Sequence, residues 1–283
     1  MMNRDIFYAY ARRAPFGGRI SKEQVTGTNA LLDAWDRHGD GDDRKLANVL
    51  AQVFHETGGR MVPVRETFAS SDRQAIRRLD AAWRQGRLPQ VSKPYWRDGW
   101  FGRGPIQVTH EDNYIRMAEA LGVDLHGKPG LLLDLEVGAL SAVKGMIDGL
   151  FSGAKLADFF NGKKDDPVGA RRIVNGSDKA RLIASYHRNF LDSIKAAREA
   201  APSDVKMIGL ADGPKLSKDK ATLGGGLLTI GTLGGAATAA QPILEGIANP
   251  YAFGAFVLIV ILAAVGGYLF LTGRLQSIRR TGV

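Results

Sequence analysis

The sequence predicts a mainly α fold on two observations. Apolar residues recur every three to four positions in several segments, and the alternating β-branched runs that predict strands are scarce. The first periodic segment, residues 45–54, places five side chains on one helix face: Leu46, Val49, Leu50, Val53 and Phe54. The fold is therefore expected to bury the apolar faces of packed helices.

The helix over residues 45–54 has recognisable boundary signals. Asp42 or Asp43 can cap its beginning, and Gly58-Gly59 can end it. Glu56 then falls in the last turn of an otherwise apolar helix. The same periodicity predicts further helices over residues 113–121, 135–150 and 180–197.

The length of 283 residues accommodates one domain of ordinary size, expected at residues 1–200, and an extension. Residues 201–222 combine Pro, Gly, Asp and Lys and predict a polar linker. Residues 223–245 are Gly-rich and fit either a tether or a second membrane segment. Residues 246–283 are expected to hold a transmembrane helix and a short basic tail, because the apolar run 251–272 covers the roughly 30 Å hydrocarbon core.

The expected topology of this tail does not decide on which side of the membrane the large N-terminal domain lies. Arg274, Arg279 and Arg280 follow the apolar run, which favours a cytoplasmic C-terminus. A single span would then place the large domain outside, although no cleavable signal peptide is visible at the N-terminus. A hairpin of two membrane segments would keep both ends inside. The expected location is anchorage in a host inner membrane or a virion membrane.

Composition narrows the partners and the chemistry. The chain has no cysteine, which excludes a disulfide framework and any thiolate ligand or nucleophile. Its formal net charge of +9 suits an anionic cell wall, a membrane surface or nucleic acid. Basic residues gather between Arg73 and Arg103 with no nucleic-acid recognition module beside them, so wall or lipid is favoured and no specific nucleic acid is expected.

Two motifs carry a family resemblance. They are the segment His55-Glu56-Thr57-Gly58-Gly59 and the segment 101–114, FGRGPIQVTHEDNY. Together, in this order, they resemble the family 19 glycoside hydrolases, which are the chitinases and related phage and bacterial cell-wall lysins. The resemblance extends loosely over residues 45–194, including segments 64–67 and 173–176. It implies a two-lobed, lysozyme-like helical catalytic domain.

Cleaving a glycosidic bond needs two carboxyl groups, one to protonate the leaving oxygen and one to activate water or attack carbon. Glu66 lies ten residues after Glu56. In an unbroken helix the two would be about 15 Å apart, which is too far. Because Gly58-Gly59 and Pro63 break the helix, the chain can fold back toward the separation of about 6.5–9.5 Å that inversion requires.

The resemblance implies a role for each of these residues. Glu56 matches the general acid, Glu66 the general base, and Thr109 the hydroxyl that helps to hold the attacking water. An acid must keep its proton, so apolar burial near Phe54 is expected at Glu56. Glu66, beside Arg65, is expected to stay ionised. Glu111 and Glu119 are the carboxylates that could compete with Glu66 as the base.

Further residues are candidates for binding substrate. Gln107 and Asn113 offer donors and acceptors to sugar hydroxyl or N-acetyl groups. Asn175 resembles a substrate-contacting asparagine of the family, although it could simply be a turn residue before a glycine. Tyr95 and Trp96 could stack on sugar rings or could belong to the core.

Other kinds of site are disfavoured. His55 is interpreted as structural, because the second histidine of a zinc-hydrolase motif is missing four residues on. The glycines around Arg103 lack the strand and the Lys-Ser/Thr pair of a phosphate loop. The acidic segment Asp36–Asp43 lacks the ligand order of a calcium loop and is interpreted as a turn with a helix cap. Neither a metal nor a cofactor is expected.

The function that the sequence favours is a membrane-anchored, inverting hydrolase of β-1,4-linked N-acetylated amino-sugar polymers. Peptidoglycan is the expected substrate and lysis by a phage or prophage the expected role. A chitinase is the first alternative. A catalytically inactive wall-binding virion or membrane protein is the second, and a holin-like activity of the tail is a third.

Overall fold

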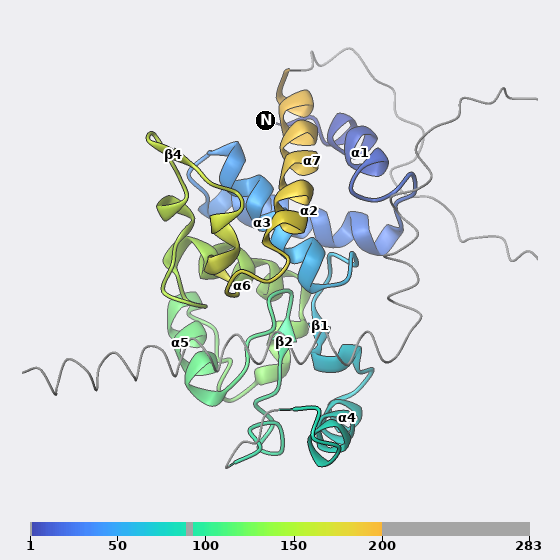
Figure 1. The fold of residues 1–283 in the computed structure, drawn as a ribbon, viewed down its shortest axis with the longest axis vertical. Helices are drawn as coiled ribbons and strands as arrows, with labels where there is room; N and C mark the ends of the chain where they lie inside the picture. Colours follow the sequence, from blue (N-terminus) through green and yellow to red (C-terminus); the bar gives the residue numbers. More distant parts are fainter. Residues whose placement is uncertain (1, 89–92, 200–283) are drawn as a thin grey trace, which may run out of the picture.

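The computed structural model describes residues 2–88 and 93–199, and over these residues the predicted mainly α fold is confirmed (Figure 1). The helices are α1 (Arg4–Arg13), α2 (Lys22–His38), α3 (Asp43–Glu56), α4 (Asp72–Arg84), α5 (Glu111–Leu121), α6 (Leu135–Asp148) and α7 (Ala180–Glu199). Short 3₁₀ helices are η1 (Glu66–Phe68), η2 (Pro129–Leu133), η3 (Leu156–Asp158) and η4 (Gly169–Ile173).

Two short antiparallel strand pairs join these helices. Strands β1 (Val64–Arg65) and β2 (Arg103–Gly104) pair with Val64 opposite Gly104. Strands β3 (Phe160–Asn161) and β4 (Lys164–Asp165) form the other pair. In the part of the chain that the structure describes, no helix is both long and apolar enough to span a bilayer. The predicted linker, Gly-rich segment and membrane helix lie outside that part.

The four helices expected from periodicity are all present, with small differences at their ends. Helix α3 begins after Asp42, whose side chain accepts a hydrogen bond from the Arg44 N–H, so the predicted cap is confirmed. Helix α6 ends two residues before the predicted limit, because Gly149 adopts a left-handed conformation that terminates it. Helix α5 begins two residues earlier than predicted, at Glu111.

Three helices were not predicted, and each has a side-chain cap at its beginning. Asn3 caps α1, Ser21 and Gln24 form a reciprocal capping box on α2, and Ser71 caps α4. Arginines interrupt the apolar pattern of α1 and α4, which weakens the periodic signal. Capping and burial together stabilise helices that periodicity alone does not identify.

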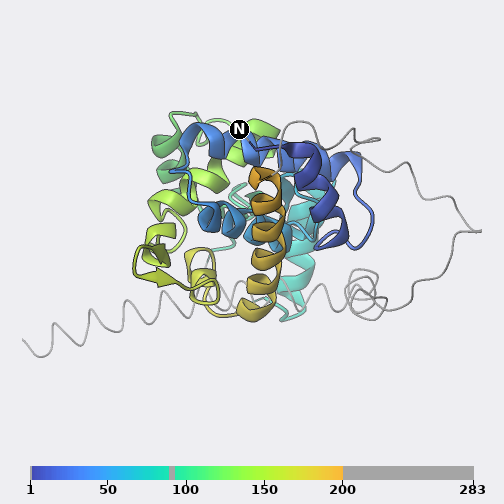
Figure 2. The same ribbon diagram turned by 90° about the horizontal axis from the view of Figure 1, so that it is seen from above.

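Helix α3 occupies the centre of the largest hydrophobic cluster. It packs against α7, α7 also packs against α1, and α2 packs against α6. Figures 1 and 2 show α7 beside α1 and α3, with α4 at the opposite end of the molecule from α1. Four of the five predicted core residues of α3 are at most 1% exposed, and Phe54 is half-buried against the same cluster. This packing fixes the end of α3 that carries Glu56.

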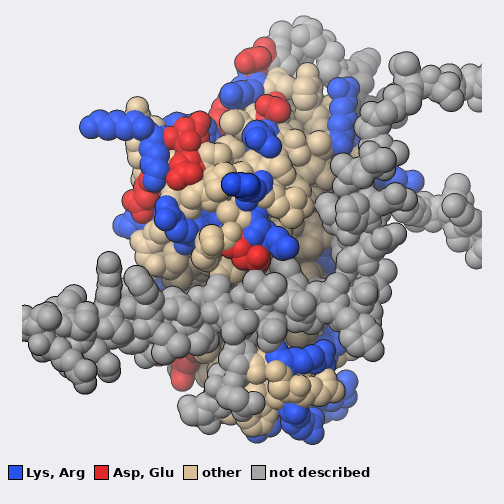
Figure 3. All heavy atoms as spheres, viewed as in Figure 1, with Lys and Arg blue, Asp and Glu red and all other residues tan. Residues whose placement is uncertain are grey.

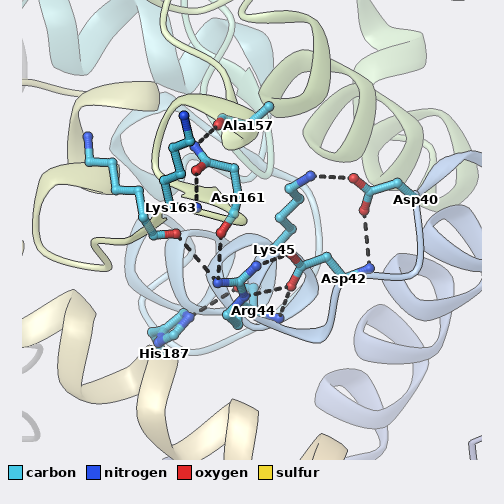
Figure 4. A network of polar contacts seen from close by, with 9 residues as sticks. Asp40, Asp42, Arg44, Lys45, Ala157, Asn161, Lys163 and His187 are labelled. Carbon is cyan, nitrogen blue, oxygen red and sulfur yellow. Dashed lines mark hydrogen bonds and ion pairs between the residues drawn. The ribbon is translucent and has the colours of Figure 1, made fainter.

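A polar network joins the beginning of α3 to the hairpin of β3 and β4 (Figure 4). The Arg44 guanidinium binds both carboxylate oxygens of Asp42, at 3.0 and 2.6 Å, and reaches the carbonyl oxygens of Asn161 and Lys164. A ring nitrogen of His187, in α7, lies 3.1 Å from the Arg44 carbonyl oxygen. The acidic segment therefore serves as a cap and an ion-pair partner.

Candidate active site

Glu56 ends helix α3 in a buried polar environment. Its Oε1 accepts a hydrogen bond of 2.6 Å from Nη1 of Arg171, and the same nitrogen donates to Oε1 of Gln52 at 2.8 Å. The two side chains of the Glu56–Arg171 pair are 5% and 0% exposed. Phe54, which was expected to provide apolar burial, instead packs against Tyr186, with ring centroids 4.8 Å apart. Glu56 therefore lies among polar partners.

Arg171 also forms hydrogen bonds that fix its own position. It belongs to η4, and its Nε donates to the carbonyl oxygen of Asp178 at 3.1 Å. The Gln52 amide donates in turn to the carbonyl oxygen of Ala170 at 3.1 Å. Sequence reasoning missed Arg171 and Gln52. The available signal was the polar pair Gln52 and Glu56, four residues apart on a helix whose other residues are mostly apolar.

Glu66 is positioned by the strand pair β1–β2. Its backbone N–H donates to the Gly102 carbonyl oxygen at 2.7 Å, and the Gly102 N–H donates to its carboxylate Oε2, also at 2.7 Å. The Tyr95 hydroxyl donates to Oε1 at 3.3 Å. Glu66 is 7% exposed, so both of its oxygens are held inside the protein.

Burial raises the pKa of Glu66, and hydrogen bonds from the Gly102 N–H and the Tyr95 hydroxyl, with the charge of Arg103, offset part of that rise. The expectation that Arg65 keeps Glu66 ionised is wrong. The guanidinium of Arg65 faces Asp72 instead, with Nε 2.6 Å from the carboxylate. The pKa of Glu66 therefore depends on burial, on Gly102 and Arg103 of the motif segment 101–114, and on the hydroxyl of Tyr95.

The glycine-rich motif forms a tight hairpin beside Glu66. Arg103 and Val108 exchange backbone hydrogen bonds, which closes the turn between them. Gln107 adopts a positive φ of 55°, and its amide donates to the carbonyl oxygens of Val64 and Gly104 at 2.9 and 2.8 Å. The Gln107 N–H donors, which were expected to reach a sugar, instead tie the hairpin to strand β1. The side-chain carbonyl oxygen of Gln107 remains uncommitted.

Thr109 lies at the same edge of the hairpin. A Cβ placed on Gly102 would lie 3.2 Å from the Thr109 methyl and 2.8 Å from Gln107 Oε1, so Thr109 is next to the glycine that binds Glu66. The Asn113 amide donates to the Thr109 carbonyl oxygen at 2.6 Å, and Asn113 Oδ1 accepts from Arg116. The structure thus places Thr109 beside Gly102, with Asn113 bracing its backbone.

The aromatic pair that precedes the hairpin is divided between two roles. Trp96 is 1% exposed, donates from its indole nitrogen to Asp80 at 2.8 Å, and lies in a hydrophobic cluster with Leu79 and Phe101. The prediction that Trp96 stacks on sugar is therefore wrong, because its ring has no accessible face. Tyr95 is half-buried and contacts Glu66 through its hydroxyl.

Asn175 lies beside Arg171, where the backbone N–H of Asn175 donates to the Arg171 carbonyl oxygen at 3.0 Å. Its Oδ1 accepts from the Gly176 N–H at 2.9 Å, which is the turn interaction that the sequence left open. Its buried Nδ2 has no hydrogen-bond partner among the described residues. Asn175 therefore combines a turn position with an uncommitted donor.

The turn between the two glutamates has a fixed geometry. Thr57 Oγ1 donates to the Val53 carbonyl oxygen at 2.7 Å and accepts from the Met61 N–H at 3.0 Å. Gly58 and Gly59 follow at positive φ angles of 59° and 81°, where glycine is favoured. The predicted break of the helix is confirmed, and the chain returns along strand β1 to Glu66.

The competing carboxylates and the histidine have other environments. Glu111 is exposed and pairs with His126 at 2.9 Å, and Glu119 is exposed on the same helix, α5. Neither is held by the hairpin. Burial lowers the pKa of His55, whose ring lies 6.5 Å from that of Tyr186. Within residues 2–88 and 93–199, no cluster of three His, Asp or Glu side chains is placed to hold a metal ion.

Comparison with known proteins agrees with the motif segments. Residues 22–143 match the family model of glycoside hydrolase family 19, described as chitinase class I. Chitinase 8 of Oryza sativa subsp. japonica is 36% identical over 89 residues, and Chitinase 11 of the same organism is 33% identical over 92 residues. Each alignment covers 31% of this chain and 29% of the rice protein.

Two solved structures are also similar. One is a chitinase C mutant, with 19% identity and a TM-score of 0.37 over 65% of this chain and 88% of the other. The second is a bacterial family 19 chitinase, with 22% identity and a TM-score of 0.36 over 66% and 89%.

The family match and the rice proteins identify the class of the matched region as glycoside hydrolase. More particularly, residues 22–143 are similar to glycoside hydrolase family 19, chitinase class I. The alignments with the rice chitinases span less than a third of those proteins.

Proposed function

We propose that this protein is an inverting glycoside hydrolase that cleaves β-1,4 bonds in polymers of N-acetylated amino sugars. The proposal rests mainly on one observation. Glu56 and Glu66 are two buried carboxyl groups in the segment matched by the family model, and each is held by its own set of donors. Buried carboxyl groups are uncommon unless paired, and hydrolysis of a glycosidic bond needs two of them.

The proposed acid is Glu56 and the proposed base is Glu66. Glu56 Oε1 is occupied by Arg171, so its Oε2 is the oxygen left to deliver a proton to the glycosidic oxygen as the bond to the anomeric carbon breaks. Glu66 accepts a proton from a water molecule, which attacks the anomeric carbon from the opposite face. The Thr109 hydroxyl, on a side chain whose methyl lies next to Gly102, would hold that water.

Two other polar side chains are proposed to contact the sugar, and two more support the catalytic residues. Asn175 has an uncommitted Nδ2 beside the Glu56–Arg171 pair, and Gln107 has an uncommitted amide oxygen beside Gly102. Tyr95 supports Glu66 through its hydroxyl, and Asn113 acts through the backbone of Thr109. In this assignment Gln107 and Asn113 mainly shape the site, while Asn175 offers an uncommitted donor to an N-acetyl group.

The proposed substrate is peptidoglycan, and the proposed role is lysis by a phage or prophage from a membrane-anchored position. The anchor is the apolar run 251–272, and the absence of cysteine fits the bacterial and phage branch of the family better than the plant branch. Chitin is the second candidate substrate. It is favoured by the description of the matched family model and by the rice chitinases.

The test uses the full-length protein and its Glu56→Gln variant with purified peptidoglycan and with chitin oligosaccharides. New ends are identified by mass spectrometry, and circular dichroism verifies that the variant is folded. Glu111→Gln serves as the matched control, because it removes an exposed carboxylate that pairs with His126. We expect muropeptide fragments from the native protein and the control but not from Glu56→Gln.

The other outcomes separate the alternatives. Cleavage of chitin alone would make the protein a chitinase. A folded native protein that binds peptidoglycan but cuts neither polymer would support the catalytically inactive wall-binding function. Near-normal turnover by Glu56→Gln would refute the assignment of the acid.

A further inference from the structure

Helix α4 presents a surface of arginines that the proposed chemistry does not use. Between residues 72 and 98 the chain holds seven basic residues and three acidic residues, so much of the net positive charge is concentrated there. Five exposed arginines of this segment form what is here named the arginine face: Arg73, Arg77, Arg78, Arg84 and Arg87. Figure 3 shows Lys and Arg side chains gathered over the end of the molecule that holds α4.

The acidic residues of this segment do not neutralise the arginine face. Asp72 pairs with arginines of strands β1 and β2, Asp80 pairs with Arg97 at 2.9 Å, and Asp98 pairs with Lys93 at 2.8 Å. Over residues 2–88 and 93–199, no arginine of the arginine face has an ion pair with a carboxylate. Arg78, Arg84 and Arg87 each donate one hydrogen bond to a neutral oxygen, of Thr67, Asp80 and Gln85 respectively. The positive charges of the arginine face thus keep no carboxylate contact among the described residues and can attract anions from outside.

The arginine face adjoins the candidate active site. Asp72, at the first position of α4, accepts hydrogen bonds from Arg65 at 2.6 Å and Arg103 at 2.9 Å, which flank Glu66 and Gly102 in the paired strands. Arg78 donates to the carbonyl oxygen of Thr67, the residue after Glu66, at 2.7 Å. A polymer bound at Glu66 would therefore place its neighbouring units or substituents near α4.

The spacing of the arginines suits an extended partner. Arg73, Arg77 and Arg84 are four and seven residues apart and lie on the same side of α4. The first and last of them span about 16 Å at 1.5 Å per residue. A guanidinium group binds a carboxylate through two parallel hydrogen bonds, which makes arginine well suited to this anion.

The same helix is poorly suited to lie on a membrane. Its apolar residues Ala75 and Leu79 are buried, and Ile76 and Trp83 pack against the same hydrophobic cluster. The large exposed hydrophobic side chains of the described residues lie in other elements. A helix that inserts into a lipid interface needs an exposed apolar face, which α4 lacks.

We infer that the arginine face binds carboxylate groups carried by peptide substituents of the glycan, so that the enzyme favours peptide-bearing strands over neutral ones. The inference rests on the proposed hydrolase function and deepens it, since peptidoglycan strands carry acidic peptides whereas chitin carries none. The attraction is electrostatic and exposed to solvent, so salt screens it.

The experiment compares kcat/KM of the full-length protein on two substrates, glycan strands with their peptides and the same strands after the peptides are removed by an amidase. The variant is Arg73→Gln/Arg77→Gln/Arg84→Gln. The matched control is Arg181→Gln/Arg188→Gln/Lys195→Gln, which removes the same charge from three exposed positions on α7 at spacings of seven. Each exposed ion pair changes binding by a factor of about two, so three together give roughly tenfold.

We expect the ratio of kcat/KM for peptide-bearing over peptide-free strands to fall about tenfold in the α4 variant and to stay constant in the control. The same ratio for the native protein should decrease when salt is raised from about 0.05 to about 0.5 M. The salt series needs no variant, so it tests the inference even if the triple substitution disturbs folding.

Three outcomes would overturn the inference. An α4 variant with the native ratio, or a native ratio that salt does not change, would show that the arginine face does not recognise the peptides while leaving the hydrolase function intact. Binding to phosphatidylglycerol vesicles that is lost in the α4 variant, with an unchanged ratio, would make the arginine face a lipid-binding surface. Failure to cut either strand would refute the proposed function. Binding of the native protein to intact peptidoglycan would then be measured, and binding that salt does not weaken would overturn the inference.

Discussion

Replacing Arg171 with methionine tests whether the buried ion pair holds the candidate acid in place. The substitution removes the nitrogen that lies 2.6 Å from Glu56 Oε1 and 2.8 Å from Gln52 Oε1, in a pair whose side chains are 5% and 0% exposed. Water cannot replace the guanidinium at so little exposure, so the Glu56 carboxyl group and the Gln52 amide oxygen are left buried without their donor. Breaking such a pair costs about 3–5 kcal/mol.

The measurement is urea unfolding of the full-length protein at pH 7, followed by tryptophan fluorescence. We expect Arg171→Met to lower the free energy of unfolding by about 3–5 kcal/mol. The double variant with Glu56→Gln should recover part of this loss, because it removes the buried carboxyl group that Arg171→Met leaves without its ion-pair partner. The resulting cycle gives the coupling between the two side chains.

A second ion pair provides the matched control. Arg198 lies 2.6 Å from Asp43, the same distance as in the buried pair, but these side chains are 39% and 24% exposed. Arg198→Met should therefore cost less than about 1 kcal/mol. If Arg171→Met also costs less than about 1 kcal/mol, or if the cycle shows no coupling, the argument that burial makes the Glu56 pair strong is refuted.

Three further predictions concern Glu66 and the hairpin. Tyr95→Phe removes a hydrogen bond that lowers the pKa of Glu66, so the acidic limb of the pH–rate profile should move to higher pH; an unmoved limb would exclude Glu66 as the group it reports. The pKa of Glu66 is raised in the folded state, so the folded protein loses stability as the pH rises from the pKa of the unfolded chain to that of the folded protein. This loss is about 1.4 kcal/mol per pKa unit. Glu66→Gln should remove it when urea unfolding is compared across pH. Gly102→Ala places a Cβ 2.8 Å from the Gln107 Oε1 and should cost about 1–3 kcal/mol together with activity, whereas Gly130→Ala, with nothing within 4 Å, should cost little.

Several features followed from local sequence patterns. Helix α3 was predictable because its apolar periodicity, the Asp42 cap and the Gly58-Gly59 stop all concern neighbouring residues. Glu56 was found through the motif 55–59 and Glu66 through the looser resemblance of segment 64–67, and both are buried. Patterns of this kind concern one helix face or one turn, so they can be recognised without knowledge of the fold.

Other features depend on contacts between distant segments. The ion-pair partner of Glu56 is Arg171, 115 residues further along the chain. The backbone N–H that donates to the Glu66 carboxylate belongs to Gly102, 36 residues further along. Arg65, adjacent to Glu66 in sequence, faces Asp72 because successive side chains of an extended strand point to opposite sides. Adjacency therefore predicted the wrong electrostatic environment.

By itself the sequence determined the mainly helical class and the uneven distribution of charge, because these depend on composition and periodicity, and it indicated the two glutamates through the family resemblance of their segments. The tertiary structure alone decided which groups surround each carboxyl, that Trp96 belongs to the core, and that the arginines of α4 keep no carboxylate partner among the described residues. The physical reason is that burial and ion pairing are properties of packed surfaces, and the sequence does not state which surfaces meet.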